Sequence, residues 1–223
     1  MGWRIVLIQL VSVLLVGTAA PGTAPQVLAQ QTIGLEAPKW GVGDHWEWEF
    51  GKDRVTWTVM GAGNDYTVAQ KSPGETGTFH VSADFSTIKG PSSLTLPQFY
   101  QLQFPLTFGN RWSYTTRSTM GRGVGPTEAE FENTRVAQGL VSITVPAGTF
   151  DSVRIFGRVR NLTTLYYGNF TVWYAPKVKQ VARISWSGAF GNSGFSGPMG
   201  GGMWSTEYAG RDLLLASYKL HNP

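Results

Sequence analysis

Three titratable side chains alternate along one short segment of the sequence, and they are the first candidates for chemistry. His45, Glu47 and Glu49 stand two residues apart in the stretch DHWEWEF, so they share one face of an extended strand. An imidazole and two carboxylates on one face could bind a metal ion or act as an acid–base pair. The same alternation is the ordinary polar face of a half-buried strand whose other face is aromatic. We favour this second interpretation.

The other groups that could do chemistry are poorly placed for it. His80 and Asp84 would point the same way along a strand but lie about 13 Å apart, which is too far for one metal ion. His221 lies in a segment where strands commonly fray. The chain has no cysteine, and it contains no GxSxG, HExxH or P-loop motif. The sequence therefore predicts a protein that is not an enzyme, with no catalytic residue, no metal ion and no cofactor.

A run of arginines is the candidate for contacts with anions. Arg154, which lies within the stretch VPAGTFDSVRI, and Arg158 and Arg160, which follow it, share one face of an expected strand, with about 6.6 Å for each two-residue step. The segment TEAEFE, residues 127–132, projects glutamates from one face of another expected strand. If the two strands are neighbours, cross-strand ion pairs neutralise the arginines. We favour these ion pairs, and an anion site is the alternative.

Aromatic residues are the candidates for binding an apolar ligand. They make up 13% of the chain, with 9 Trp, 8 Tyr and 12 Phe, and aromatic side chains on the concave face of a curved sheet form a pocket for apolar molecules. The residues that we expect to line such a cup are Trp46, Trp48, Trp112, Tyr114, Trp173 and Trp186. Two alternatives remain: the same residues could fill the core of a β-domain, or an exposed row of tryptophans could bind carbohydrate.

The segments that carry these side chains have the two-residue period of β-strands. VTWTV, YTVAQ, TFHVS, RWSYTTRST and NFTVWYA alternate in polarity and are rich in Thr, Val and aromatic residues. Glycine-containing turn sequences separate them at short intervals. We count about a dozen candidate strands, and we expect helix only early in the mature chain or between Leu94 and Gln103. The sequence thus predicts an all-β fold with little helix, either a curved antiparallel sheet or an open β-barrel.

A short motif occurs twice. GDHWEW, which begins at Gly43, recurs as GNRWSY, which begins at Gly109. In each copy a glycine and an Asx residue, Asp44 or Asn110, precede one variable residue and an aromatic-x-aromatic strand start, and Asx side chains suit a turn there. The repeat indicates a two-lobe internal duplication.

The first 29 residues have the layout of a secretory signal peptide. One arginine, Arg4, precedes an apolar run from Ile5 to Val16, and small residues lead up to Ala29. The run is shorter than the roughly 20 apolar residues that a membrane-spanning helix needs. We expect cleavage after Ala29, with an uncleaved anchor as the alternative. Residues 30–223 then form a single β-rich domain that is not an integral membrane protein.

Composition narrows the compartment and the partners. The chain is 14% charged with a formal net charge of +4, and no block of like charges occurs, so we expect no nucleic-acid partner. An exported chain without cysteine favours a bacterial periplasmic or extracellular location. Residues 187–203, SGAFGNSGFSGPMGGGM, are expected to form a mobile glycine-rich loop.

Three motifs in the second half of the chain carry a resemblance. VPAGTFDSVRI, then WYAPKVKQVARISW, then LLLASYKL resemble the uncharacterised bacterial exported β-proteins, the TapB-like and related domains of unknown function. Those proteins carry turn glycines where this chain has Lys177 and Lys179, and a lysine at positive φ would strain the turn. The resemblance implies an antiparallel sheet curled into an open barrel, similar to the bacterial lipoprotein carriers. It implies no activity.

These observations together predict a non-enzymatic, exported protein of a bacterial cell envelope. The favoured function is binding of an apolar or lipid-like ligand in a curved β-sheet cup. The first alternative is a structural or protein-interaction module of the envelope with a filled aromatic core, and a carbohydrate-binding module is the second. An apolar cavity would support the cup, whereas a filled core and an envelope protein partner would support the interaction module.

Overall fold

A computed structural model describes seven segments of the chain: residues 34–73, 75–85, 87–89, 101–120, 127–162, 167–187 and 212–221. The predicted signal peptide, residues 1–29, lies outside the described residues. The predicted glycine-rich loop also lies outside them, except for Ser187, which is the last residue of a strand. Of the segment where a helix was expected, residues 94–100 lie outside the described residues. In the described segments, no helix has the length and apolar character needed to cross a membrane.

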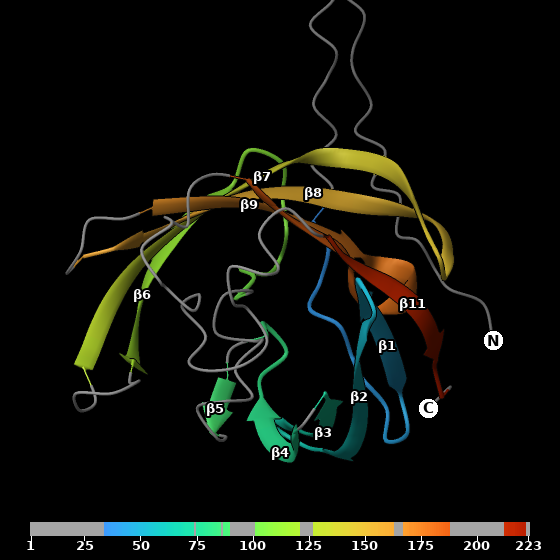
Figure 1. The fold of residues 1–223 in the computed structure, drawn as a ribbon. Coiled ribbons are helices and arrows are strands. Elements are labelled where there is room, and N and C mark those ends of the chain that lie inside the picture. Colours follow the sequence, from blue (N-terminus) through green and yellow to red (C-terminus); the bar gives the residue numbers. More distant parts are fainter. Residues whose placement is uncertain are drawn as a thin grey trace, which may run out of the picture. The chain divides into compact units, whose positions relative to one another are not determined.

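The described strands form one antiparallel sheet of 11 strands (Figure 1). They are β1 (His45–Phe50), β2 (Asp53–Ala62), β3 (Tyr66–Ser72), β4 (Glu75–Val81), β5 (Thr87–Lys89), β6 (Arg111–Met120), β7 (Thr127–Val145), β8 (Gly148–Asn161), β9 (Tyr167–Ala175), β10 (Gln180–Ser187) and β11 (Leu213–Lys219). Their order across the sheet is β5-β4-β3-β2-β1-β11-β10-β9-β8-β7-β6. The all-β prediction is therefore confirmed, and among the described strands the sheet is open, with β5 and β6 at its edges.

The sheet consists of two runs of neighbouring strands that meet in its middle. The chain passes from β1 outward to β5, continues at the opposite edge with β6, and returns strand by strand to β11, which pairs with β1. Curvature brings the inner faces of the two runs together: the Trp46 indole N–H on β1 donates a 2.8 Å hydrogen bond to the Val178 carbonyl beyond β9. The rings of Phe85 and Tyr174, one from each run, lie 6.0 Å apart. One continuous apolar core fills the inner face.

Alternation in the sequence decides which side chains enter that core. On β1, the side chains of Trp46, Trp48 and Phe50 are buried, and the intervening charged residues face outward. On β8, Val153, Ile155 and Val159 are likewise buried. Because a strand turns every second side chain to the same face, a period-two sequence produces one apolar and one polar face.

The two copies of the repeated motif have the same backbone arrangement. Gly43 has a φ of 90°, its N–H donates to the Val59 carbonyl at 2.8 Å, and the Val59 N–H donates to the Asp44 carbonyl at 2.9 Å. In the second copy, Gly109 has a φ of 78°. Its N–H donates to the Ala137 carbonyl at 2.7 Å, and the Ala137 N–H donates to the Asn110 carbonyl at 3.0 Å. The hairpins β1–β2 and β6–β7 are therefore equivalent, as the repeat predicted.

The turn after β9 contains the lysines that stand in place of glycines. Pro176–Val178 form a single 3-10 turn, η3, which includes Lys177. Lys179 has the left-handed backbone conformation, with φ 56° and ψ 25°, so one of the two lysine positions does require positive φ. Its ammonium lies 3.6 Å from a carboxylate oxygen of Asp44, whose side chain is fully buried. An ion pair thus accompanies the unfavourable backbone conformation.

Candidate functional site

The three titratable residues of β1 lie on the outer face and contact polar residues of β2. Glu47 forms an ion pair with Arg54, and a second nitrogen of Arg54 lies 3.6 Å from Glu49. His45 Nδ1 lies 2.8 Å from Thr58 Oγ1. Within the described segments, no group of three His, Asp or Glu side chains is arranged to hold a metal ion. This placement corresponds to a polar strand face with a cross-strand ion pair.

Two of the six predicted cup residues lie in the middle of the core. Trp46 is 0% and Trp48 3% exposed. Their indole N–H groups donate to the carbonyls of Val178 and Val181, each at 2.8 Å. Trp46 also packs against Trp40, with ring centroids 5.4 Å apart. These indoles therefore connect the two runs of the sheet.

The other four predicted cup residues are half-buried, and they are divided between the two faces. Trp112 and Tyr114 belong to the inner face of β6, and the Trp112 indole donates to the Gln101 carbonyl at 3.1 Å. Trp186 packs its ring edge-on against Phe50, 6.2 Å away. Trp173 alternates with buried residues of β9 and lies on the outer face, where Arg183 stacks over its ring at 4.7 Å. The structure therefore does not place all six residues in one cup.

A buried arginine beside Tyr114 was missed by the sequence analysis. Arg135 on β7 is 2% exposed, and its guanidinium lies 4.1 Å from the ring centroid of Phe170 and 5.3 Å from that of Tyr114. It donates to the Tyr114 hydroxyl at 2.8 Å and to the Thr134 carbonyl at 2.8 Å. Burial raises the pKa of Tyr114, and the charge of Arg135 opposes that shift.

Two features of the sequence are linked to this buried arginine. Arg135 is in phase with Phe131 and Ala137, which are buried on the same strand face. On the adjacent strand, its Cα partner is Gly157, whose missing side chain leaves room for the ring of Phe170. Side chains two residues apart on a strand share a face. The apolar residues Phe131 and Ala137, in the same alternation as Arg135, were therefore the available indication that this arginine points inward.

The three predicted anion-contact arginines lie exposed on the outer face of β8. The TEAEFE segment is the start of β7, and only its last two residues, Phe131 and Glu132, pair with β8. The register places Glu132 opposite Arg160. Arg158 faces Thr134, and Arg154 faces Gly139. Glu130 instead lies 3.5 Å from Arg117 of β6. The predicted neutralisation by facing glutamates is therefore available to one of the three arginines.

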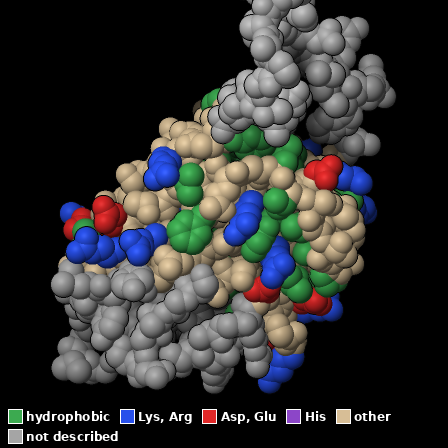
Figure 2. Space-filling model, turned by 90° about the horizontal axis from the view of Figure 1, so that it is seen from above, with side chains coloured by type: hydrophobic (Ala, Val, Ile, Leu, Met, Phe, Trp, Pro, Cys, Tyr) green, Lys and Arg blue, Asp and Glu red, His purple; other side chains and the backbone are tan. Residues whose placement is uncertain are grey.

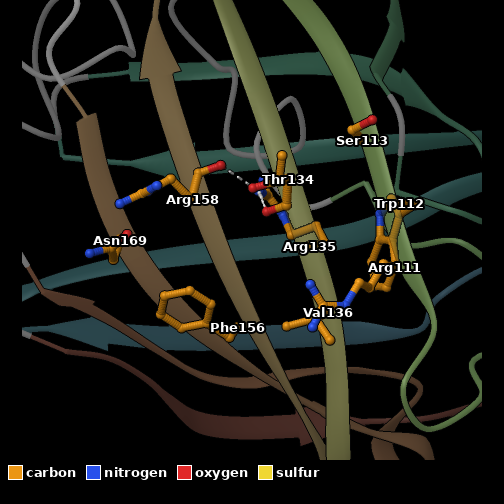
Figure 3. A pocket seen from close by; sticks show the side chains of 9 residues that line it. All are labelled: Arg111, Trp112, Ser113, Thr134, Arg135, Val136, Phe156, Arg158 and Asn169. Atoms are coloured by element: carbon orange, nitrogen blue, oxygen red, sulfur yellow. Dashed lines mark hydrogen bonds between the residues drawn. The ribbon is translucent and has the colours of Figure 1, made fainter.

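An open depression of about 520 Å³ lies on the outer face of strands β6 to β9 (Figure 3). Figure 3 shows the Arg111 side chain of β6 extending towards Val136 of β7, whereas the Arg158 side chain of β8 extends the other way, towards Asn169 of β9. The described residues that line it are Arg111, Trp112, Ser113, Thr134, Arg135, Val136, Phe156, Arg158 and Asn169. None of these described residues is acidic. Figure 2 shows the surrounding face, over β7 to β9, where Lys and Arg side chains are interspersed with hydrophobic ones.

Comparisons with known proteins complete the description of the chain. No protein-family model matches it, and no curated protein matches it. Three solved structures resemble it.

The first is a protein from Bacteroides fragilis described as exported with a YmcC-like fold, at 13% identity and a TM-score of 0.42, covering 84% of this chain and 100% of that one. The second is the hypothetical lipoprotein YmcC from Escherichia coli, at 9% identity and a TM-score of 0.44, covering 81% of this chain and 85% of that one. The third is described as a lipoprotein from Parabacteroides distasonis, at 12% identity and a TM-score of 0.38, covering 84% of this chain and 99% of that one. At these identities and TM-scores, the likenesses carry no conclusion about what this chain does.

Proposed function

We propose that the chain is a non-enzymatic, exported protein of a bacterial envelope that acts through contacts at its surface, around a filled aromatic core. The N-terminal pattern supports export, and the absence of cysteine in an exported chain supports a bacterial envelope. The observation that carries the proposal is that the N–H groups of buried indoles are hydrogen-bonded within the protein. Trp46 and Trp48 donate to backbone carbonyls, and Trp57 donates to the side-chain oxygen of Gln70 at 2.9 Å. Aromatic residues whose faces and N–H groups are occupied by the protein itself are core residues.

Binding of a lipid-like ligand is the second candidate, and one observation favours a particular place for it. Trp112 and Tyr114 on β6 are half-buried, whereas their equivalents in the repeat, Trp46 and Trp48, are buried. The inner face is therefore less completely filled at β6 than at β1. An apolar ligand would gain most at β6, because it would remove exposed aromatic surface from water there.

Native mass spectrometry separates the two candidates. The chain comprising residues 30–223 is purified from a periplasm without detergent, and its native mass is compared with its denatured mass. A surface-acting protein gives equal masses and takes up no apolar fluorescent probe.

The contrary result is extra mass that extracts into organic solvent. If Trp112→Ala abolishes its retention and Trp173→Ala, on the opposite face, does not, then the chain carries its ligand on the inner face of β6. That outcome would overturn the filled-core proposal.

A further inference from the structure

We infer that the depression on the outer face of the sheet binds an acidic sugar residue, a pyranose ring that carries a carboxylate. The sugar ring stacks on Phe156, and its carboxylate pairs with Arg111. This inference deepens the surface-contact function proposed above and rests on it, because it names the chemical class of one partner. The site lies on the face opposite to the core, so it needs no space inside the sheet.

Phe156 supplies an aromatic surface in the lining of the depression. It is half-buried on β8 and alternates with the buried residues Ile155 and Gly157, so it belongs to the outer face. In Figure 3, which looks into the depression, the Phe156 ring is seen nearly face-on. One side of a pyranose ring presents mainly C–H groups. Contact between those groups and the face of the phenyl ring removes apolar surface from water.

Arg111 supplies a positive charge beside this ring. Arg111 on β6 is the Cα partner of Val136 on β7, which is in turn the Cα partner of Phe156 on β8. The Arg111 side chain extends towards Val136, which brings its guanidinium over the strand next to Phe156 (Figure 3). Neighbouring strands lie about 4.8 Å apart, so a carboxylate attached to a sugar ring on Phe156 is within reach of that guanidinium. A guanidinium and a carboxylate form two parallel, charge-assisted hydrogen bonds.

The Arg111 guanidinium is available for such a partner. Arg111 is exposed, and it takes part in none of the ion pairs formed between described residues. Arg117, on the same face of β6, lies instead 3.5 Å from Glu130. The Arg158 side chain extends the other way, towards Asn169, and the proposed contact does not involve it. The positive charge at this position is therefore that of Arg111 alone.

Neutral hydroxyls in the lining suit the hydroxyl groups of a sugar. Ser113 and Thr134 are exposed, and they face each other across β6 and β7, two residues along from the pair that contains Arg111. A hydroxyl both donates and accepts hydrogen bonds, and so does each hydroxyl of a sugar. A small inorganic anion gains nothing from Phe156, and an acyl chain leaves the polar groups without partners. An acidic sugar uses the aromatic ring, the hydroxyls and the guanidinium together.

Isothermal titration calorimetry tests the inference on residues 30–223. Trigalacturonate and trimannuronate offer pyranose rings with carboxylates, maltotriose offers neutral pyranose rings, and triglutamate offers carboxylates without sugar rings. Triglutamate is included because a chain with a net charge of +4 attracts anions in general. We expect saturable binding of at least one acidic trisaccharide. The affinities for maltotriose and triglutamate should be at least about ten-fold lower.

Single variants test the two contacts separately. Arg111→Gln should lower the affinity for the acidic trisaccharide by roughly ten-fold. Phe156→Leu keeps an apolar side chain but removes the aromatic face, and it should lower the affinity by roughly three- to ten-fold. The matched control Arg117→Gln removes the same charge from the same face of β6 and should retain the affinity within about two-fold. Circular dichroism and thermal unfolding of each variant check that the sheet is intact.

Three results would overturn the inference. Equal affinity for triglutamate, or equal losses in Arg111→Gln and Arg117→Gln, would mean attraction by charge without a sugar site. Binding of maltotriose that Arg111→Gln leaves unchanged would mean that the site takes a neutral sugar. Failure to bind both acidic trisaccharides would mean that the depression is not a site for acidic sugars. The mass and probe measurements described above report separately on the filled core, so the two proposals can fail independently.

Discussion

The ion pair between Lys179 and Asp44 lies where the chain departs from an expected glycine. Asp44 also accepts hydrogen bonds from the backbone N–H groups of Gly41, at 2.8 Å, and His221, at 2.6 Å. The left-handed conformation of Lys179 costs about 1–2 kcal/mol relative to glycine, but removing one member of a buried ion pair costs more. We expect Lys179→Gly to lower the free energy of unfolding by about 1–3 kcal/mol, as measured by urea denaturation.

A double-mutant cycle checks this explanation. In an Asp44→Asn background no carboxylate is left unpaired, so Lys179→Gly should then have a much smaller effect. The coupling free energy should be at least about 1 kcal/mol. Additive effects of the two substitutions would mean that the ion pair does not compensate the backbone strain.

Gly157 is required by the close approach of a neighbouring ring. A Cβ atom at this position would lie 2.4 Å from Cζ and 2.6 Å from Cε2 of Phe170. We expect Gly157→Ala to destabilise the protein by about 1–3 kcal/mol, because Phe170 must move and its stacking with Arg135 is disturbed. The measurement is the urea midpoint, with Gly63→Ala as the control, since a Cβ there has no neighbour nearer than 3.9 Å.

Burial of Tyr174 makes the free energy of unfolding depend on pH in the alkaline range. Desolvation raises the pKa of its phenol, so above the ordinary value of about 10 the unfolded chain loses a proton that the folded chain retains. Its contribution to stability is therefore complete below pH 10 and is lost as the pH rises towards the folded-state pKa. Above pH 10, Tyr174→Phe should make the decline in the free energy of unfolding less steep by about 1.4 kcal/mol per pH unit. Urea denaturation at several pH values above 10 measures this slope. Tyr218 is half-buried, and Tyr218→Phe is the control for the loss of a hydroxyl.

At the scale of single elements, the two equivalent hairpins provide a matched comparison. Gly43 and Gly109 both have positive φ, but a Cβ at Gly43 would lie 2.9 Å from the His221 ring, whereas one at Gly109 meets nothing within 4 Å. We expect Gly109→Ala to cost about 1–2 kcal/mol from backbone strain alone. Gly43→Ala should cost more, because it adds a steric clash. Thermal unfolding of both variants tests the order, and a larger effect at Gly109 would contradict it.

Local patterns were sufficient to predict the strands and their inner faces. The alternation in DHWEWEF and the turn glycines are properties of short segments, and the structure confirms both the strand and the repeated turn. The phase of NFTVWYA also separates Trp173 from the buried Phe170 and Val172, although the sequence analysis grouped it with the cup residues. The register between distant strands could not be predicted, because no local pattern specifies which glutamate faces which arginine.

The depression on the outer face could not be predicted from local patterns either. Arg158 was a candidate from its own strand, but Arg111 comes from a strand whose position beside β7 and β8 depends on the whole sheet. Arg135 was missed because charged residues are almost never fully buried unless they are paired. Its burial depends on Gly157 and Phe170, which belong to two other strands.

At the scale of the whole molecule, one apolar core connects both runs of strands. A core substitution in the last strand should therefore destabilise both runs. Leu215 on β11 is 0% exposed. We expect Leu215→Ala to lower the free energy of unfolding by about 2–5 kcal/mol, and tryptophan fluorescence and circular dichroism should show coincident transitions. The control is Ser217→Ala on the exposed part of the same strand. Separate transitions in Leu215→Ala would mean that the two runs unfold independently.

The pairing of β1 with β11 also determines when the protein can fold. The contact between Asp44 and His221 spans 177 positions of the chain, and the strand next to β1 is the last strand of the sheet. Contacts of such long range form late, because their loop-closure entropy must be overcome first. The centre of the sheet therefore cannot assemble before β11 has been synthesised and is free to pair with β1. If the chain is exported as proposed, it passes through the membrane before its sheet is complete, and the release of β11 on the far side allows the two runs to join.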